Sequence, residues 1–108
     1  MNNTENDKIK KYERLAVKKP KFYVSIGDLY FDNGDFKTAT IYYQKAVDNG
    51  VLAYTVLGDT WGYRSQYKKA FDAYMEGANN VAKPVVDMTV VTWKNAYLTE
   101  SPTDPNIS

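Results

Sequence analysis

The sequence predicts an all-α fold, a short stack of antiparallel helix pairs with about six helices in all. Residues 23–77 contain two similar copies of one pattern, and equivalent residues such as Gly27 and Gly58 differ by a constant 31 positions (58 − 27 = 31). Within each copy, apolar residues recur at helical spacing. Asn-Gly pairs then divide the chain into short helices. A fixed period of about 20–50 residues is typical of stacked repeat proteins.

Aromatic residues in the two copies occupy the same places, and so do small residues. The matched pairs are Tyr23 with Tyr54, Gly27 with Gly58, Asp28 with Asp59, Tyr30 with Trp61, Phe36 with Tyr67, Ala39 with Ala70, Tyr43 with Tyr74 and Ala46 with Gly77. We expect the aromatic rings to fill the spaces above the small residues. One hairpin cannot bury both of its faces, so neighbouring helices must stack.

The N-terminal helix and the first repeat are expected over 6–18 and 21–48. The first of these caps the stack with a stripe of Ile9, Tyr12, Leu15 and Ala16, and residues 1–5 before it are polar and frayed. The first repeat divides into helices over 21–32 and 36–48. Asn33-Gly34 ends the earlier helix and Asp35 caps the later one.

The second repeat is expected over 51–79, with helices over 51–62 and 66–79 and with Ser65 as the cap between them. Gly58 and Gly62 both fall inside the earlier helix. Because glycine weakens a helix by about 1 kcal/mol relative to alanine, each should have a packing reason, such as close approach of the partner helix.

Residues 83–98 are expected to form a C-terminal capping helix, the first helix of a third repeat. Val85 and Met88 follow Tyr54 and Leu57 by the same 31 positions. The segment is also rich in Val and Thr, so pairing elsewhere as a strand stays open. Residues 1–98 would then form a single domain, and 99–108, with two prolines and no apolar period, a disordered tail.

Composition argues against an enzyme. The chain has neither Cys nor His, which removes a cysteine nucleophile, the usual general base and the commonest metal ligand. We therefore expect no cofactor and no metal. Net charge is +1, so no global field attracts nucleic acid or a membrane surface. No apolar run approaches a signal peptide core or a membrane span, and a cytoplasmic protein is the expectation.

The two copies resemble the tetratricopeptide repeat. The matching residues are Tyr23, Ile26-Gly27, Tyr30, Ala39, Tyr43 and Ala46, and again Tyr54, Leu57-Gly58, Trp61, Ala70, Tyr74 and Gly77. The resemblance implies a right-handed α-solenoid whose first helices line a concave groove. The period of 31 is shorter than the family's 34. The connection between repeats therefore looks more like that of the Sel-one-like repeat.

The candidate binding residues come from the first helix of each repeat. If those helices line the groove, Asp28 and Asp59 lie about 8–10 Å apart, one helix spacing. They are either solvated surface charges or acceptors for a Lys, Arg or amino terminus of a partner; paired acid catalysis ranks below both. The seven candidates are Val24, Asp28, Phe31, Asp32, Thr55, Asp59 and Tyr63.

These features favour a non-catalytic adaptor that binds a peptide or helix of a partner protein in its groove. The first alternative is a homo-oligomeric assembly subunit, in which incompletely capped ends of the stack pair with each other. The second, ranked below it, is a regulator that contacts nucleic acid through the basic N-terminal helix. A lysine run on a helix is more often a solvated face, so we do not expect nucleic acid as the partner.

Overall fold

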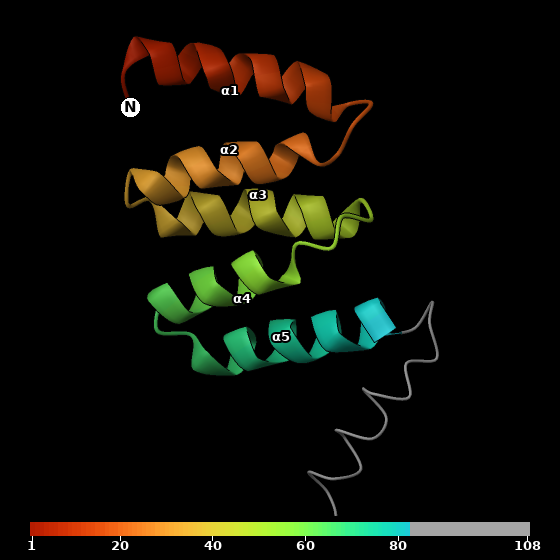
Figure 1. Cartoon of the computed structure of the whole chain (residues 1–108). Coiled ribbons are helices and arrows are strands. Elements are labelled where there is room, and N and C mark those ends of the chain that lie inside the picture. The colour runs from red at the N-terminus through yellow and green to blue at the C-terminus, as the bar shows by residue number, and fades with distance from the viewer. Residues whose placement is uncertain (83–108) are drawn as a thin grey trace, which may run out of the picture. The chain divides into compact units, whose positions relative to one another are not determined.

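Five helices and no strand make up residues 1–82, the part of the chain that the computed structural model describes (Figure 1). The helices are α1 (Asn3–Ala16), α2 (Phe22–Asp32), α3 (Phe36–Asp48), α4 (Tyr54–Tyr63) and α5 (Tyr67–Ala82). The all-α prediction is therefore confirmed for this part. The expected helix over 83–98 and the expected tail over 99–108 lie outside the described residues.

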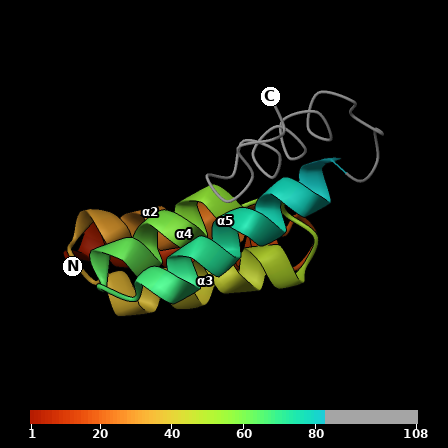
Figure 2. The same ribbon diagram turned by 90° about the horizontal axis from the view of Figure 1, so that it is seen from below.

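Helices that are neighbours in sequence pack against each other. The chain divides into two compact units, Met1–Ala78 and Asn79–Ser108. In the first unit, α1 contacts α2, α2 contacts α3 and α3 contacts α4. The connections alternate between the two ends of the helices, so neighbours run antiparallel (Figure 1). Figure 2 shows α2 and α4 on one side of the view and α3 on the other.

Three of the predicted helix boundaries were wrong by three residues, and one of them is the end of α5, which lies at Ala82 rather than residue 79. α1 begins at Asn3 rather than residue 6, because the side chain of Asn2 caps it by accepting a hydrogen bond from the backbone N–H of Glu5 at 2.8 Å. α4 begins at Tyr54 rather than residue 51. The backbone N–H of Val51 is bonded back to the carbonyl of Ala46 at 2.9 Å, which holds Val51 outside the new helix.

The turns within the two hairpins have one shape and different residues. In the first, Gly34 adopts φ 79°, and Asp35 caps α3 by accepting from the Thr38 N–H at 3.1 Å, as predicted. In the second, Ser65 adopts φ 59° and takes the place of Gly34. The prediction that Ser65 caps α5 was therefore wrong. The carbonyl of the next residue, Gln66, accepts the first helical bond of α5, from Ala70.

The hairpins are held together by tyrosine rings that lie against glycines. A Cβ atom added to Gly27 would stand 2.5 Å from the ring of Tyr43, and one added to Gly58 would stand 2.5 Å from the ring of Tyr74. Only glycine permits an approach this close. The expectation for Gly62 was wrong, because nothing lies within 4 Å of a Cβ placed there.

The core runs along the helix faces that these contacts bring together. Its buried apolar residues are Ile9, Ala16, Ile26, Ala39, Tyr43, Ala46, Ala53, Leu57, Ala70 and Ala73. Leu15, expected in the N-terminal stripe, is 37% exposed instead. Within residues 1–82, no helix combines the length and the apolar character needed to cross a membrane.

Candidate functional site

Asp28 and Asp59, the two predicted carboxylates, each accept a hydrogen bond from the tyrosine that covers the preceding glycine. The hydroxyl of Tyr43 donates to Asp28 Oδ1 at 2.5 Å, and the hydroxyl of Tyr74 donates to Asp59 Oδ1. Each Gly-Asp pair thus receives one tyrosine from the second helix of its hairpin, with its ring on the glycine and its hydroxyl on the carboxylate. Both carboxylates have a structural role in addition to any role in binding.

The carboxylates keep these tyrosines protonated. Burial, with the hydrogen bond to Asp28 as the next cause, raises the pKa of Tyr43 far above its ordinary value. The hydrogen bond to Asp59 is the main reason that the pKa of Tyr74 is raised. Ionising either hydroxyl would place two negative charges side by side, so both tyrosines remain donors across the physiological range.

Three of the seven predicted residues, Asp28, Phe31 and Asp59, line one cavity of about 190 Å³ between α2 and α4. Tyr63 joins Asp59 in a second hollow of about 410 Å³, which includes Tyr74. We call Asp28, Phe31, Asp59 and Tyr63 the carboxylate surface. These four residues from the first helices of both hairpins therefore form one continuous surface.

An aromatic cluster supports this surface at one end. The rings of Phe31 and Phe36 lie 5.0 Å apart, and the ring of Tyr63 lies 5.1 Å from each of them. Tyr63 meets Phe31 edge to face, a favourable aromatic arrangement. Although Tyr63 is 63% exposed, these contacts fix its ring. A partner would therefore meet a ring that is already ordered.

The other three predicted residues do not line either of these hollows. Val24 is half-buried against the core, so most of its side chain already has partners. Asp32 is exposed at the end of α2, near enough to Tyr43 to raise its pKa further. Thr55 is exposed in the first turn of α4.

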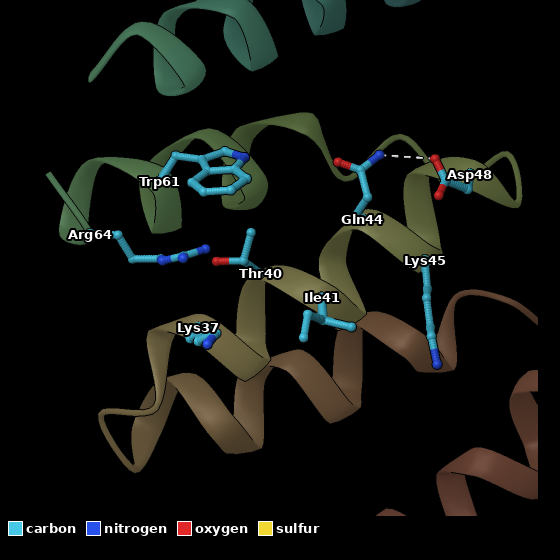
Figure 3. A pocket seen from close by; sticks show the side chains of 8 residues that line it. All are labelled: Lys37, Thr40, Ile41, Gln44, Lys45, Asp48, Trp61 and Arg64. Atoms are coloured by element: carbon cyan, nitrogen blue, oxygen red, sulfur yellow. Dashed lines mark hydrogen bonds between the residues drawn. The ribbon is translucent and has the colours of Figure 1, made fainter. Parts of the chain in front are cut away.

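A third hollow, of about 450 Å³, lies between α3 and α4 (Figure 3) and was not predicted. We call it the tryptophan pocket. Six of its lining residues come from α3 and two from α4 or its end: Lys37, Thr40, Ile41, Gln44, Lys45, Asp48, Trp61 and Arg64. Ile41, 50% exposed, and the half-buried ring of Trp61 supply apolar surface.

The equivalent place in the first hairpin is bridged by a tyrosine. Tyr42 of α3 stacks on Tyr30 at 5.6 Å, and its hydroxyl donates to Glu13 of α1 at 2.9 Å. In the second copy, 31 positions later, the residue equivalent to Tyr30 is Trp61 and the residue equivalent to Tyr42 is Ala73. A methyl group on α5 cannot reach past Trp61 of α4 to α3, so α5 and α3 are not bridged there. The sequence contains a sign of this pocket, because the two copies differ at the position of Tyr42 and Ala73.

Cations rather than a ring cover Trp61. The guanidinium carbon of Arg64 lies 4.5 Å from the centre of the ring, and the ammonium of Lys69 lies 4.6 Å from it. Cations are attracted to the electron-rich face of an indole. The Lys45 ammonium is placed in the same way, 5.0 Å from the ring centre of Tyr42. The pocket is thus rimmed by ordered positive charge.

The carboxylates of Asp28 and Asp59 are each occupied by a tyrosine hydroxyl. Among residues 1–82, no three acidic side chains gather closely enough to hold a metal ion. No family model matches the chain, and no curated protein or solved structure is significantly similar to it.

Proposed function

We propose that this chain is a protein-interaction module, a tetratricopeptide-like α-solenoid whose carboxylate surface binds a cationic segment of a partner protein. The observation that carries the proposal is the cavity lined jointly by Asp28, Phe31 and Asp59. Two carboxylates and an aromatic ring from successive first helices suit a Lys or Arg side chain, with the aliphatic part of that side chain lying on the ring.

Order in the carboxylate surface supports the same role. Each carboxylate is oriented by a tyrosine hydroxyl, and the Tyr63 ring is held by Phe31 and Phe36. A carboxylate has two oxygens and can accept several hydrogen bonds, so the tyrosine leaves capacity for a partner. A surface that is already ordered loses less entropy when it binds.

The test is affinity capture with the tagged chain from its native lysate, followed by measurement of the affinity of the captured protein. Asp28→Asn with Asp59→Asn keeps an oxygen that accepts the tyrosine hydroxyl and removes both charges. We expect at least tenfold weaker binding from this double variant. Asp7→Asn, at an exposed position of α1, is the control and should bind as the parent does. Unchanged affinity in the double variant would refute the proposal.

Self-association is the second candidate. Tyr67 and Phe71, one turn apart on α5, are 70% and 62% exposed. Exposed aromatic residues that adjoin each other mark association surfaces more often than single ones do. Light scattering over a concentration series would detect a dimer, and Phe71→Glu should dissociate it. A chain that stays monomeric at high concentration would dismiss this candidate.

A further inference from the structure

We propose that the tryptophan pocket docks an acidic peptide segment that carries a bulky apolar side chain. The carboxylate surface was assigned a cationic segment, so the two places would recognise opposite charges. This proposal does not depend on the proposed function of the carboxylate surface. The supporting observations are the position of the pocket, its apolar lining and its cationic rim.

The pocket faces a different direction from the carboxylate surface. Asp59 and Trp61 are two positions apart on α4. Each step along an α-helix turns the side chain by about 100° around the axis, so two steps turn it by about 200°. Their side chains therefore leave α4 in nearly opposite directions. The cavity that Asp59 lines and the tryptophan pocket share no lining residue. A partner segment can occupy one place while the other is empty.

An apolar anchor fits the interior of the pocket. Its volume of about 450 Å³ lies within the range of about 300–1,000 Å³ of ligand sites. The exposed half of Ile41 and the ring of Trp61 face it from two helices (Figure 3). In the first hairpin an aromatic side chain, Tyr42, bridges the equivalent place. An aromatic or branched side chain from a partner would take the place that Tyr42 occupies in the first hairpin.

The rim selects the charge of the partner. Lys37, Lys45 and Arg64 line the pocket, and Lys69 lies over Trp61. Asp48 is the one carboxylate in the lining, and it already accepts a hydrogen bond from Gln44 at 2.9 Å. Carboxylates that flank the anchor of the partner would therefore meet an excess of positive charge.

A peptide suits this rim better than a nucleic acid does. Single-stranded nucleic acids gain much of their affinity by stacking bases on aromatic rings. Arg64 and Lys69 already lie over the ring of Trp61, and a base would have to displace one of them. Carboxylates instead pair with those cations where they stand. The observations favour the acidic peptide, and an oligonucleotide serves as the competing probe.

The test uses fluorescence anisotropy of a labelled acidic peptide, rich in Asp and Glu with a central Leu-Phe pair, titrated with the full chain. The comparison probes are the same peptide with Gly-Gly at its centre and a labelled oligothymidylate. We expect the Leu-Phe peptide to bind at least about tenfold more tightly than either. Equal binding of the Gly-Gly peptide, tighter binding of the oligonucleotide, or no binding of the Leu-Phe peptide would overturn the proposal.

Variants locate the binding. Lys37→Gln with Arg64→Gln should weaken it about tenfold. Lys10→Gln with Lys11→Gln removes the same charge from exposed positions of α1 and should leave it within about twofold. Asp28→Asn with Asp59→Asn should also leave it unchanged, which separates this proposal from the carboxylate surface. Ile41→Asp, at a half-exposed position that can accept a charge, should abolish it. Wild-type affinity in Ile41→Asp would overturn the proposal.

Discussion

The two helical hairpins share a framework and differ in how one side is closed. In both, a tyrosine ring covers a glycine and its hydroxyl meets the next aspartate. In the first, Tyr42 of α3 also bridges to α1; in the second, Ala73 of α5 makes no such bridge to α3, beside Trp61. Repeated residues therefore maintain the fold, whereas the residue that differs creates the pocket.

Removal of the bridging tyrosine should have the largest effect on stability. Tyr42→Ala loses the ring stacked on Tyr30 and the hydrogen bond to Glu13. Because Tyr42 is only half-buried, we expect a loss of about 2 kcal/mol in the free energy of unfolding, below the cost of a fully buried aromatic. Urea unfolding followed by circular dichroism measures it. A loss below about 0.5 kcal/mol would mean that the bridge does not hold α3 to α1.

The two glycines covered by tyrosines should respond unequally to a methyl group. Tyr43 is 2% exposed, so its ring has no space into which to move, whereas Tyr74 is 42% exposed and can yield. Overpacking costs about 1–3 kcal/mol, and alanine returns about 1 kcal/mol of helix propensity. We expect Gly27→Ala to destabilise by about 1–2 kcal/mol and Gly58→Ala to be nearly neutral. Equal losses in thermal unfolding would contradict this asymmetry.

The turn residues should show a reciprocal effect. Ser65 holds φ 59° where the first hairpin has Gly34 at φ 79°, and a non-glycine residue is strained in this region. Ser65→Gly should therefore stabilise the chain by about 0.5–1 kcal/mol, and Gly34→Ser should destabilise it by a similar amount. Denaturant midpoints of the two variants decide this. A loss of stability in Ser65→Gly would show that the serine side chain makes a contact that matters more than strain.

The smallest effect at neutral pH concerns the ionisation of the bridging tyrosine. Burial, with the hydrogen bond to Glu13 as the next cause, raises the pKa of Tyr42 to about 12 from its ordinary value of 10.0. The unfolded chain therefore releases this proton first, so stability is fully present below pH 10 and falls between about pH 10 and 12. Tyr42→Phe should flatten the decline of the urea midpoint over this window. An unchanged decline would contradict the assignment.

Sequence patterns predicted the features that the two hairpins share. The helix over 36–48, its cap Asp35 and the packing of aromatic rings on small residues follow from local periodicity and repetition, and the structure confirms them. The placement of Asp28 and Asp59 on successive first helices also followed from the constant offset. Residues at equal register in a repeat occupy equal environments, which is why this reasoning works.

Features that depend on exceptions to the repetition were missed. Ser65 has the composition of a helix cap, but its register, 31 positions after Gly34, places it in the left-handed turn. The start of α4 at Tyr54 depends on the backbone bond from Val51 to Ala46, which no side-chain pattern reveals. The tryptophan pocket depends on Ala73, and a small residue gives no positive signal by itself. Comparing the copies position by position for differences would have found two of the three.

The most direct test of the difference between the bridged first hairpin and the open tryptophan pocket compares the quenching of a single tryptophan at the two equivalent positions, 30 and 61. Trp93→Phe leaves Trp61 as the reporter, and Tyr30→Trp with Trp61→Tyr and Trp93→Phe moves the reporter to the first hairpin. Iodide is an anion and should collect at the rim formed by Lys37, Arg64 and Lys69. We predict a quenching constant at least about threefold higher at position 61 than at position 30, with caesium showing no such preference. Equal iodide constants at the two positions would contradict an open cationic pocket in the second hairpin.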